Sequence, residues 1–148
     1  MNNYPVWWDS TITIYNKYQD PQTRVVRWIR NVVNGVFWKA VGDKIIIGNT
    51  SIDTGKILCR IRKDTRYMPK HEWLQIPNDE MQDYFTLGKG DIIILGEVED
   101  VVNEGQSGQR STDLITKYKD LQGCMSIEEI AINIGAGRVN EHYLVKGK

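Results

Sequence analysis

Cysteine and histidine are scarce in this sequence, which holds two residues of each. Cys59 and Cys124 lie far apart and neither belongs to a Cys-x-x-Cys pair, so the spacing typical of zinc or redox sites is missing. His71 is followed by Glu72, but no second histidine stands at the spacing of a zinc-protease helix. The sequence therefore predicts no metal site and two buried free thiols.

Net charge is also missing, because 19 lysines and arginines balance 19 aspartates and glutamates. This balance excludes a whole-chain electrostatic attraction to nucleic acid, although it leaves room for a local basic patch. No apolar run is long enough to span a membrane, and residues 1–5 lack the pattern of a signal peptide. We expect no membrane partner, and a protein that works inside a cell or in a particle assembled there.

Catalytic motifs are the third absence. Neither a Gly-x-Ser-x-Gly elbow nor a phosphate-binding loop occurs, and no helical pattern follows the glycines of residues 88–90. His142 sits in an alternating apolar segment, where a structural role is expected. Carboxylates are abundant, so a hydrolase that uses two of them stays open as an alternative. We predict a non-enzymatic protein without catalytic residues, cofactor or metal.

The sequence does contain a dense β-branched stretch at residues 84–98. Residues 84–87 are predicted as a short strand and residues 88–91 as a turn, because glycine adopts positive φ without steric cost. Residues 92–98 are apolar at consecutive positions, which favours a strand buried on both faces. We expect this hairpin to be the centre of a single domain covering residues 1–148.

Shorter strand patterns surround this hairpin. Residues 11–15 alternate isoleucine with polar or aromatic residues, which predicts a half-buried strand. Residues 24–37 are rich in Val, Ile and Trp around Asn34 and Gly35, which predicts one long strand or two joined by a bulge. Further strands are expected at residues 44–47, 57–62, 130–134 and 142–145. Together these patterns predict a mainly β fold, a small antiparallel β-barrel or sandwich with long loops.

A single helix is expected at residues 111–122, because Leu114, Ile115, Tyr118 and Leu121 recur at helical spacing. Ser111 is a candidate N-cap, and Gly123 ends the pattern. Pro69 and Pro77 break residues 63–78, where we expect irregular chain with a short edge strand at residues 73–76. Residues 79–83 are predicted to form at most one helical turn.

An aromatic arm precedes these elements at residues 1–10, which hold Tyr4, Pro5, Trp7 and Trp8. Two interpretations of the arm remain open. It either closes one end of the core as a lid or docks on a neighbouring subunit, because Tyr and Trp are enriched at interfaces.

Residues 85–98 resemble a signature of small structural proteins from tailed bacteriophages (siphophages) that infect Gram-positive bacteria. The similarity extends to the segments at residues 11–17, 33–38, 59–61, 114–121 and 142–147, in the same order and spacing. The plan of the chain is similar to that of head-closure proteins, or stoppers, in the head–tail connector.

The resemblance implies a small β-barrel without enzymatic activity, located in the virion and assembled in the host cytoplasm. The implied partners are the adaptor and portal ring, a tail terminator or tail proteins, and other copies of the chain in a ring of six or twelve subunits. Packaged double-stranded DNA would lie in the channel, held without sequence specificity. Because such rings form on a preassembled template, we expect the isolated protein to be monomeric.

Three segments are long enough to leave the barrel and contact these partners, namely residues 48–55, 63–78 and 103–110. The first is polar and flanked by glycines, which suits a gate facing the channel; its candidate residues are Asn49, Thr50, Ser51, Asp53 and Thr54. The second combines aromatic and basic side chains, which is typical of interface anchors. With the arm it gives the candidate interface residues Trp7, Trp8, Arg66, Tyr67, His71 and Trp73. The third segment leads to the helix, and its composition is equally compatible with contact to solvent and contact to the tail. All three could also be ordinary surface loops.

Other functions stay open beside the stopper. A tail terminator or another connector ring protein belongs to the same class. A single-strand nucleic-acid binder of the OB type would also be a small β-barrel with a basic groove and stacking aromatics, for which Trp7, Trp8, Trp28 and Trp38 are candidates. A nuclease is the alternative among enzymes.

Overall fold

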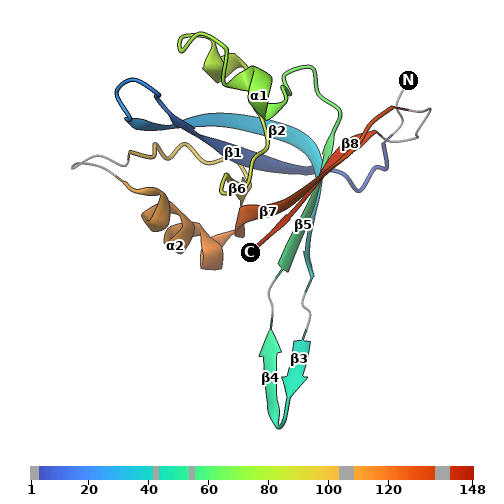
Figure 1. The fold of residues 1–148 in the computed structure, drawn as a ribbon. Coiled ribbons are helices and arrows are strands. Elements are labelled where there is room, and N and C mark those ends of the chain that lie inside the picture. Colours follow the sequence, from blue (N-terminus) through green and yellow to red (C-terminus); the bar gives the residue numbers. More distant parts are fainter. Residues whose placement is uncertain (1–3, 42–43, 54–55, 104–108, 136–140) are drawn as a thin grey trace.

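A closed antiparallel barrel of six strands forms the centre of the computed structural model, which describes residues 4–41, 44–53, 56–103, 109–135 and 141–148 (Figure 1). The mainly β fold predicted from the sequence is confirmed, with a barrel rather than a sandwich. Around the barrel the strands follow the order β1 (Ser10–Gln19), β2 (Val26–Val41), β5 (Lys56–Arg62), β8 (His142–Gly147), β7 (Cys124–Asn133) and β6 (Ile92–Leu95). Strand β6 then pairs with β1 and closes the ring.

Strand β2 turns a corner of the barrel, because it pairs first with β1 and then with β5. The β1–β2 register shifts where Ser10 faces Val36 and Thr11 faces Asn34, which leaves Gly35 as the extra residue of a bulge. Gly35 has a φ of 70°, a conformation that glycine adopts without a clash between Cβ and the backbone. The prediction of a long strand with a bulge at this place is confirmed.

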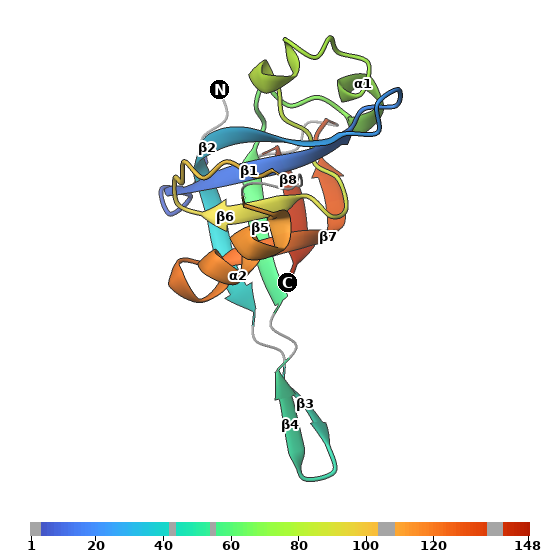
Figure 2. The same ribbon diagram turned by 90° about the vertical axis from the view of Figure 1, so that its left-hand side faces the viewer.

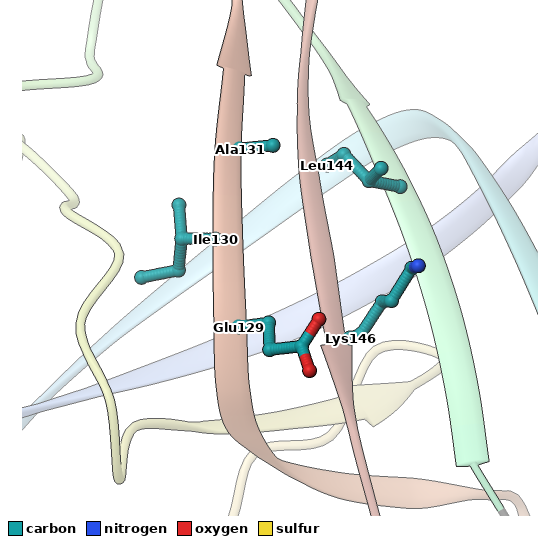
Figure 3. A pocket seen from close by; sticks show the side chains of 5 residues that line it. All are labelled: Glu129, Ile130, Ala131, Leu144 and Lys146. Atoms are coloured by element: carbon teal, nitrogen blue, oxygen red, sulfur yellow. The ribbon is translucent and has the colours of Figure 1, made fainter.

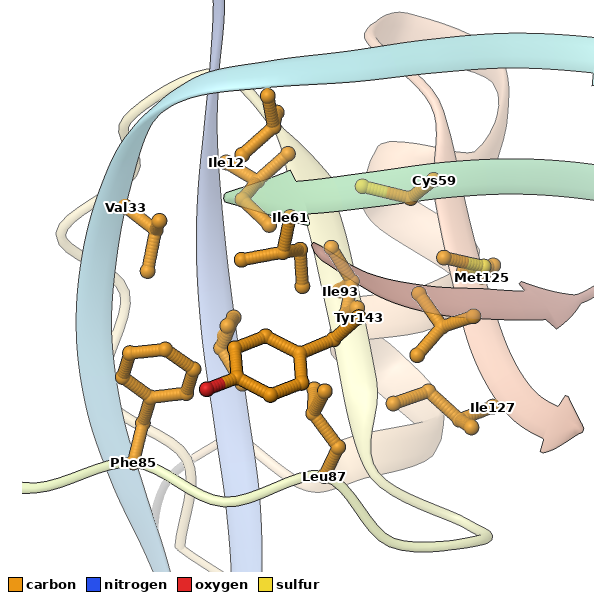
Figure 4. Close-up of a cluster of buried hydrophobic side chains, with 13 residues drawn as sticks. Ile12, Val33, Cys59, Ile61, Phe85, Leu87, Ile93, Met125, Ile127 and Tyr143 are labelled. Carbon is orange, nitrogen blue, oxygen red and sulfur yellow. The ribbon is translucent and has the colours of Figure 1, made fainter. Parts of the chain in front are cut away.

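The interior of the barrel is filled by apolar side chains that alternate along the strands (Figure 4). In β5, Cys59 and Ile61 point inward and are fully buried, as their period of two predicted. Tyr143 and Val145 of β8 meet them from the neighbouring strand. The complete interior cluster is Ile12, Ile14, Val33, Val36, Cys59, Ile61, Phe85, Leu87, Ile93, Met125, Ile127, Tyr143 and Val145.

Strands β1 and β6 are buried on both faces. Ile93 points into the barrel, whereas Ile92 and Ile94 pack outside it, which explains three consecutive buried isoleucines. In β1, Thr13 and Tyr15 are buried as well, so the prediction of a half-buried strand is wrong there. The outer face is covered by residues 96–102 and by helix α2 (Ser111–Leu121).

Helix α2 lies where the sequence predicted it and packs Leu114 and Tyr118 on the outside of the barrel. It begins one residue earlier than predicted, because Ser111, the expected cap, is already helical. The N-cap is Arg110, whose backbone N–H donates to the carboxylate of Asp113 at 3.1 Å. That contact satisfies an amide that has no partner within the helix. Gly123 follows the helix with a φ of 110°, as expected for a residue that ends it.

The predicted hairpin of residues 84–98 does not form. Strand β6 ends at Leu95 and pairs with β1 and β7, while Phe85 makes a single bridge to Tyr67. The turn is organised instead by Asp91, which is 1% exposed. Its carboxylate accepts hydrogen bonds from the backbone amides of Lys17 at 3.0 Å and Gly88 at 2.9 Å, and from the side-chain amide of Asn16 at 2.8 Å.

Asn16 extends this network to residues 84–87. Its side-chain amide donates to the carbonyl of Thr86 at 2.7 Å, and its side-chain oxygen accepts from the amide of Thr86 at 3.2 Å. The segment before the turn is therefore held by a buried side chain of β1 and by backbone hydrogen bonds of Phe85 to Arg66 and Met68, and not by pairing with β6. Burial raises the pKa of Asp91, against the lowering effect of these donors and of Lys70.

Residues 63–83 carry the largest departure from the sequence prediction. Short helix α1 (Lys70–Trp73) and the turns after it replace the expected edge strand at residues 73–76. The 3-10 helix η1 (Met81–Asp83) agrees with the single helical turn predicted at residues 79–83. Pro69 starts α1 as its N-cap rather than preventing a helix, because proline lacks only an amide that the first turn does not use. Trp73 and Met81 are fully buried against Tyr18 and Ile29 of the β1–β2 ribbon.

A second, separate sheet consists of β3 (Lys44–Ile47) and β4 (Thr50–Asp53). It projects from the end of the barrel where β2 stops and β5 begins, opposite the end that carries α1 (Figures 1 and 2). Among the described residues, no helix has the length and apolar character needed to cross a membrane.

Replacing Asp91 by alanine should strongly destabilise the protein, because one buried and two partly buried N–H groups would lose their acceptor. We expect the free energy of unfolding to fall by about 3 kcal/mol or more. Urea denaturation followed by tryptophan fluorescence measures this loss. Asp79→Ala at an exposed position is the matched control and should change stability by less than about 0.5 kcal/mol. Equal stabilities of the two variants would contradict the role given to Asp91.

Replacing Gly147 by alanine should disrupt the β7–β8 seam. An ideal Cβ at Gly147 would lie 2.0 Å from the carbonyl oxygen of Ser126, so the two strands would have to move apart. We expect a loss of about 1–3 kcal/mol, typical of overpacking, and a lower melting temperature in calorimetry. Lys148→Ala alters the exposed neighbour and should leave the melting temperature unchanged. An unchanged melting temperature for Gly147→Ala would show that the seam tolerates a methyl group.

Candidate functional site

The β3–β4 hairpin contains most of the segment that the sequence assigned to a gate. Gly48 and Asn49 form its two-residue turn, with Gly48 at a φ of 62°, and both are exposed. Thr50, Ser51 and Asp53 lie in the returning strand β4, whereas Thr54 falls outside the described residues. The predicted polar loop is therefore the tip and one strand of a regular hairpin.

The backbone register places the isoleucines of this hairpin. Ile45 faces Ile52 across the two strands and Ile47 faces Thr50, so these four positions share one face by the period of two. Lys44, Ile46, Ser51 and Asp53 occupy the other face. Isolated two-stranded sheets are only marginally stable in water. No described strand of the barrel pairs with the hairpin.

The aromatic arm folds back on the barrel. Trp8 is buried, with its ring 5.3 Å from that of Tyr4 and 5.5 Å from that of His142 between ring centroids. The hydroxyl of Tyr4 donates to the carbonyl of Glu141, and the guanidinium of Arg62 donates to the carbonyl of Trp8 at 2.8 Å. The interpretation of the arm as a lid is therefore correct for Tyr4 and Trp8. It also removes Trp8 from the candidate interface residues.

Val6 and Trp7 behave differently from the rest of the arm. Val6 is 88% exposed and Trp7 is 63% exposed, although the residues on both sides are held by the barrel. A large exposed aromatic on an anchored loop loses little conformational freedom when it binds a partner. Of the two tryptophans predicted at an interface, Trp7 is the accessible one.

The aromatic and basic segment at residues 63–78 is mostly structural. Tyr67 lies against Tyr143 with ring centroids 4.1 Å apart, and its pKa is raised by burial. Arg66 forms an ion pair with Asp64 at 3.0 Å and donates to the carbonyl of Val32 at 3.1 Å. Trp73 is fully buried, so its assignment to an interface is corrected to a core position. His71 is the exposed member of this predicted group, and its Nε2 lies 4.0 Å from Oε1 of Glu72.

An open groove of about 320 Å³ is lined by Glu72 of α1 and by residues of the turns between α1 and η1 and on either side of them. Its apolar surface comes from partly exposed core residues, and its polar surface from two carboxylates and an amide. The lining residues are Met68, Glu72, Gln75, Ile76, Pro77, Glu80 and Tyr84. Sequence reasoning missed this groove because its residues come from turns whose apolar members follow no period of two or 3.6.

A smaller hollow of about 100 Å³ lies on the outer face of β7 and β8 (Figure 3). Glu129 and Ala131 of β7 face Lys146 and Leu144 of β8 in the register, while Ile130 points to the other side of the strand. The hollow is well below the size of sites that enclose small molecules, which is roughly 300–1,000 Å³. It is a dimple in the surface of the barrel.

The third predicted segment is only partly described. Asn103 donates its backbone N–H to the carbonyl of Gln109 at 2.6 Å, and residues 104–108 lie outside the described part of the chain. Asp100, just before this segment, binds the side chains of Lys117 and Tyr118 in α2, and these contacts lower the pKa of Asp100. Asp100 therefore ties α2 to the segment that follows β6.

Groups suited to catalysis are not gathered in the described residues. No cluster of His, Cys, Asp or Glu there could hold a metal ion. Both cysteines are free and buried, as predicted, and burial raises the pKa of each thiol, to about 11 for Cys124. A raised pKa keeps a thiol protonated and thus poorly nucleophilic near neutral pH.

The four tryptophans proposed for base stacking do not form one platform. Trp8 is in the lid, Trp38 packs against the barrel interior, and Trp28 packs against the cluster under α2 with Lys17 6.0 Å from its ring. Trp7 is the exposed one of the four.

Comparison with known proteins adds a family. The protein-family model described as Family of unknown function (DUF6751) matches residues 7–148. No curated protein matches the chain, and no solved structure matches it. The match covers the last residues of the arm, from Trp7 on, together with the barrel, the hairpin and α2.

The two thiols should be inert in the folded protein. We expect no modification by iodoacetamide at pH 8 in native buffer and modification of both cysteines in urea, because unfolding exposes them and removes the shift in pKa. Mass spectrometry of the intact protein counts the added groups. A native protein that gains a group within minutes would show that Cys59 or Cys124 is accessible.

Proposed function

We propose that the chain, which belongs to this family of unknown function, is a ring-forming subunit of the head–tail connector of a tailed bacteriophage, in the position of the head-closure protein or stopper. It would join the adaptor and portal ring to the tail and help to retain packaged double-stranded DNA. The proposal assigns no enzymatic activity and no cofactor. It locates the protein in the virion.

The projecting β3–β4 hairpin is the observation that carries this proposal. A connector subunit needs a rigid body for contacts in the ring and an extension that reaches the channel. The barrel provides the body, because its six strands are all paired and its interior is packed. The hairpin provides the extension, since strands of four residues reach roughly 13 Å at about 3.3 Å per residue.

The chemistry of the hairpin suits contact with DNA without sequence reading. Its exposed tip, Gly48 and Asn49, is uncharged and polar. A tip of this kind obstructs the channel by its position and forms few strong ion pairs with phosphates. DNA held in this way could leave when the gate opens, because affinity for DNA rises with the number of phosphates neutralised by Lys and Arg.

The other candidate functions receive less support from the geometry. A tail terminator or another connector ring would use the same barrel and is separated from a stopper by its position in the virion. A single-strand binder needs aromatics along one basic groove, and the tryptophans lie on different parts of the barrel. Salt-dependent binding of short oligonucleotides would favour it, and magnesium-dependent relaxation of supercoiled plasmid would favour a nuclease.

Deleting the hairpin should separate DNA retention from assembly. In infected cells we expect a subunit with residues 44–53 replaced by Gly-Ser to enter particles, while DNA-filled heads fall at least tenfold. Electron microscopy of lysates counts filled and tailed heads, and nuclease-protected DNA gives an independent measure. Asp79→Ala, an exposed substitution outside the hairpin, should leave both counts unchanged.

Two results would contradict the proposal. Filled heads that retain DNA and join tails normally, with the shortened subunit present, would show that the hairpin does not act as a gate. Absence of the native chain from purified virions by mass spectrometry would reject the connector function itself.

A further inference from the structure

The arm presents an apolar tip without an apolar neighbour to cover it. Val6 and Trp7 are 88% and 63% exposed, while Tyr4 and Trp8 on either side are held by Glu141 and Arg62. Exposed apolar groups held on an ordered loop are more informative than the same groups on a free tail, because their position is fixed before any partner binds.

The groove between α1 and η1 has the complementary character. Met68, Ile76 and Tyr84 are only half-buried there, and they also pack against the Trp73 and Met81 cluster. The groove has a volume of about 320 Å³, within the roughly 300–1,000 Å³ of sites that hold small molecules, so it has room for one aromatic side chain. The base of the groove belongs to the core, so it does not need to be formed on binding.

The polar groups of the groove fit an indole in particular. Trp carries a single hydrogen-bond donor, the Nε1–H, and no acceptor. Glu72 and Glu80 are exposed carboxylates at the groove, and Gln75 adds a side-chain carbonyl. A tryptophan that places its ring on the apolar base therefore finds acceptors for its N–H at the rim.

The arm and the groove belong to different sides of the molecule. In both views the N-terminal segment lies apart from α1, and both lie away from the hairpin (Figures 1 and 2). A knob and a hole on different faces form a heterologous contact, in which each copy uses one face toward one neighbour and the other face toward the next. Such contacts build rings when the rotation between copies closes.

We propose that Val6 and Trp7 of one copy dock in the groove of Met68, Ile76 and Tyr84 on a second copy, as the lateral contact of a ring. This inference rests on the proposed connector function and names the two surfaces through which neighbouring copies would contact each other. The hairpins of all copies then occupy equivalent positions, because copies in a closed ring are related by rotation about one axis, and the contact leaves them free because the arm and the groove both lie away from the hairpin. Trp7 is the anchor, and Glu72, Gln75 and Glu80 are the acceptors at the rim.

Disulfide trapping between two variants tests this contact. Val6→Cys keeps Trp7 intact, and Gln75→Cys places a thiol at the rim of the groove on another molecule. Mixed at high protein concentration under mild oxidation, the pair should form covalent heterodimers at least tenfold faster than Val6→Cys mixed with Leu121→Cys, an exposed site on α2. The native thiols are buried and should contribute little background.

A second substitution tests the anchor. Trp7→Ala in the Val6→Cys variant should lower the trapping rate at least fivefold, while Trp7→Phe should lower it less because it keeps an aromatic ring. Trp7 is exposed, so the fold should remain unchanged by circular dichroism. Equal rates for the Gln75 and Leu121 pairs, or a rate that Trp7→Ala does not change, would overturn the proposed contact.

The outcome for this contact is separable from that for the connector function. Failure of trapping with the native chain present in purified virions would reject the contact and leave the function. Selective trapping with the chain absent from virions would support the contact and reject the function.

Discussion

A single buried carboxylate, Asp91, determines how the two halves of this barrel meet. It accepts hydrogen bonds from Lys17 and Asn16 of β1 and from Gly88 in the turn before β6. Strands β1 and β6 are far apart in sequence, and their pairing closes the barrel. A carboxylate buried without donors would be costly, so the site is stable only when the turn, β1 and Asn16 are all in place. The hydrogen bonds that stabilise the buried carboxylate of Asp91 are thus the same ones that hold β1 beside the turn before β6.

The alternating patterns of the sequence predicted the parts of the fold that depend on local periodicity. Cys59 and Ile61 in β5, the bulge at Gly35 and the helix around Leu114 all follow from spacing or from glycine chemistry. The predicted hairpin of residues 84–98 did not form, because Asn16 and Asp91 supply contacts that no pattern within that stretch reveals. Tertiary hydrogen bonds between distant residues leave no local signal.

Burial by neighbouring segments explains the remaining differences. Thr13 and Tyr15 are polar enough to predict a wet face, yet α2 and residues 96–102 cover them, and the Thr13 hydroxyl donates to the carbonyl of Gly96 at 2.8 Å. Trp73 was expected at a surface because basic residues surround it, but its ring meets Tyr18 at 6.0 Å between centroids. For the candidate site, composition identified Trp7 and the polar tip at Asn49. It did not reveal the groove between α1 and η1, whose apolar residues come together through two short turns.

The position of β8 has a consequence for how the protein is made. Strand β8, at residues 142–147, pairs with β5 on one side and with β7 on the other. Until it leaves the ribosome, β5 and β7 each present an unpaired edge, and β1, β2 and β6 can form only an open sheet. Exposed edges of this kind readily pair with other chains. A nascent chain is thus prone to aggregate for as long as β8 has not joined the barrel, and each step that delays β8 lengthens that period.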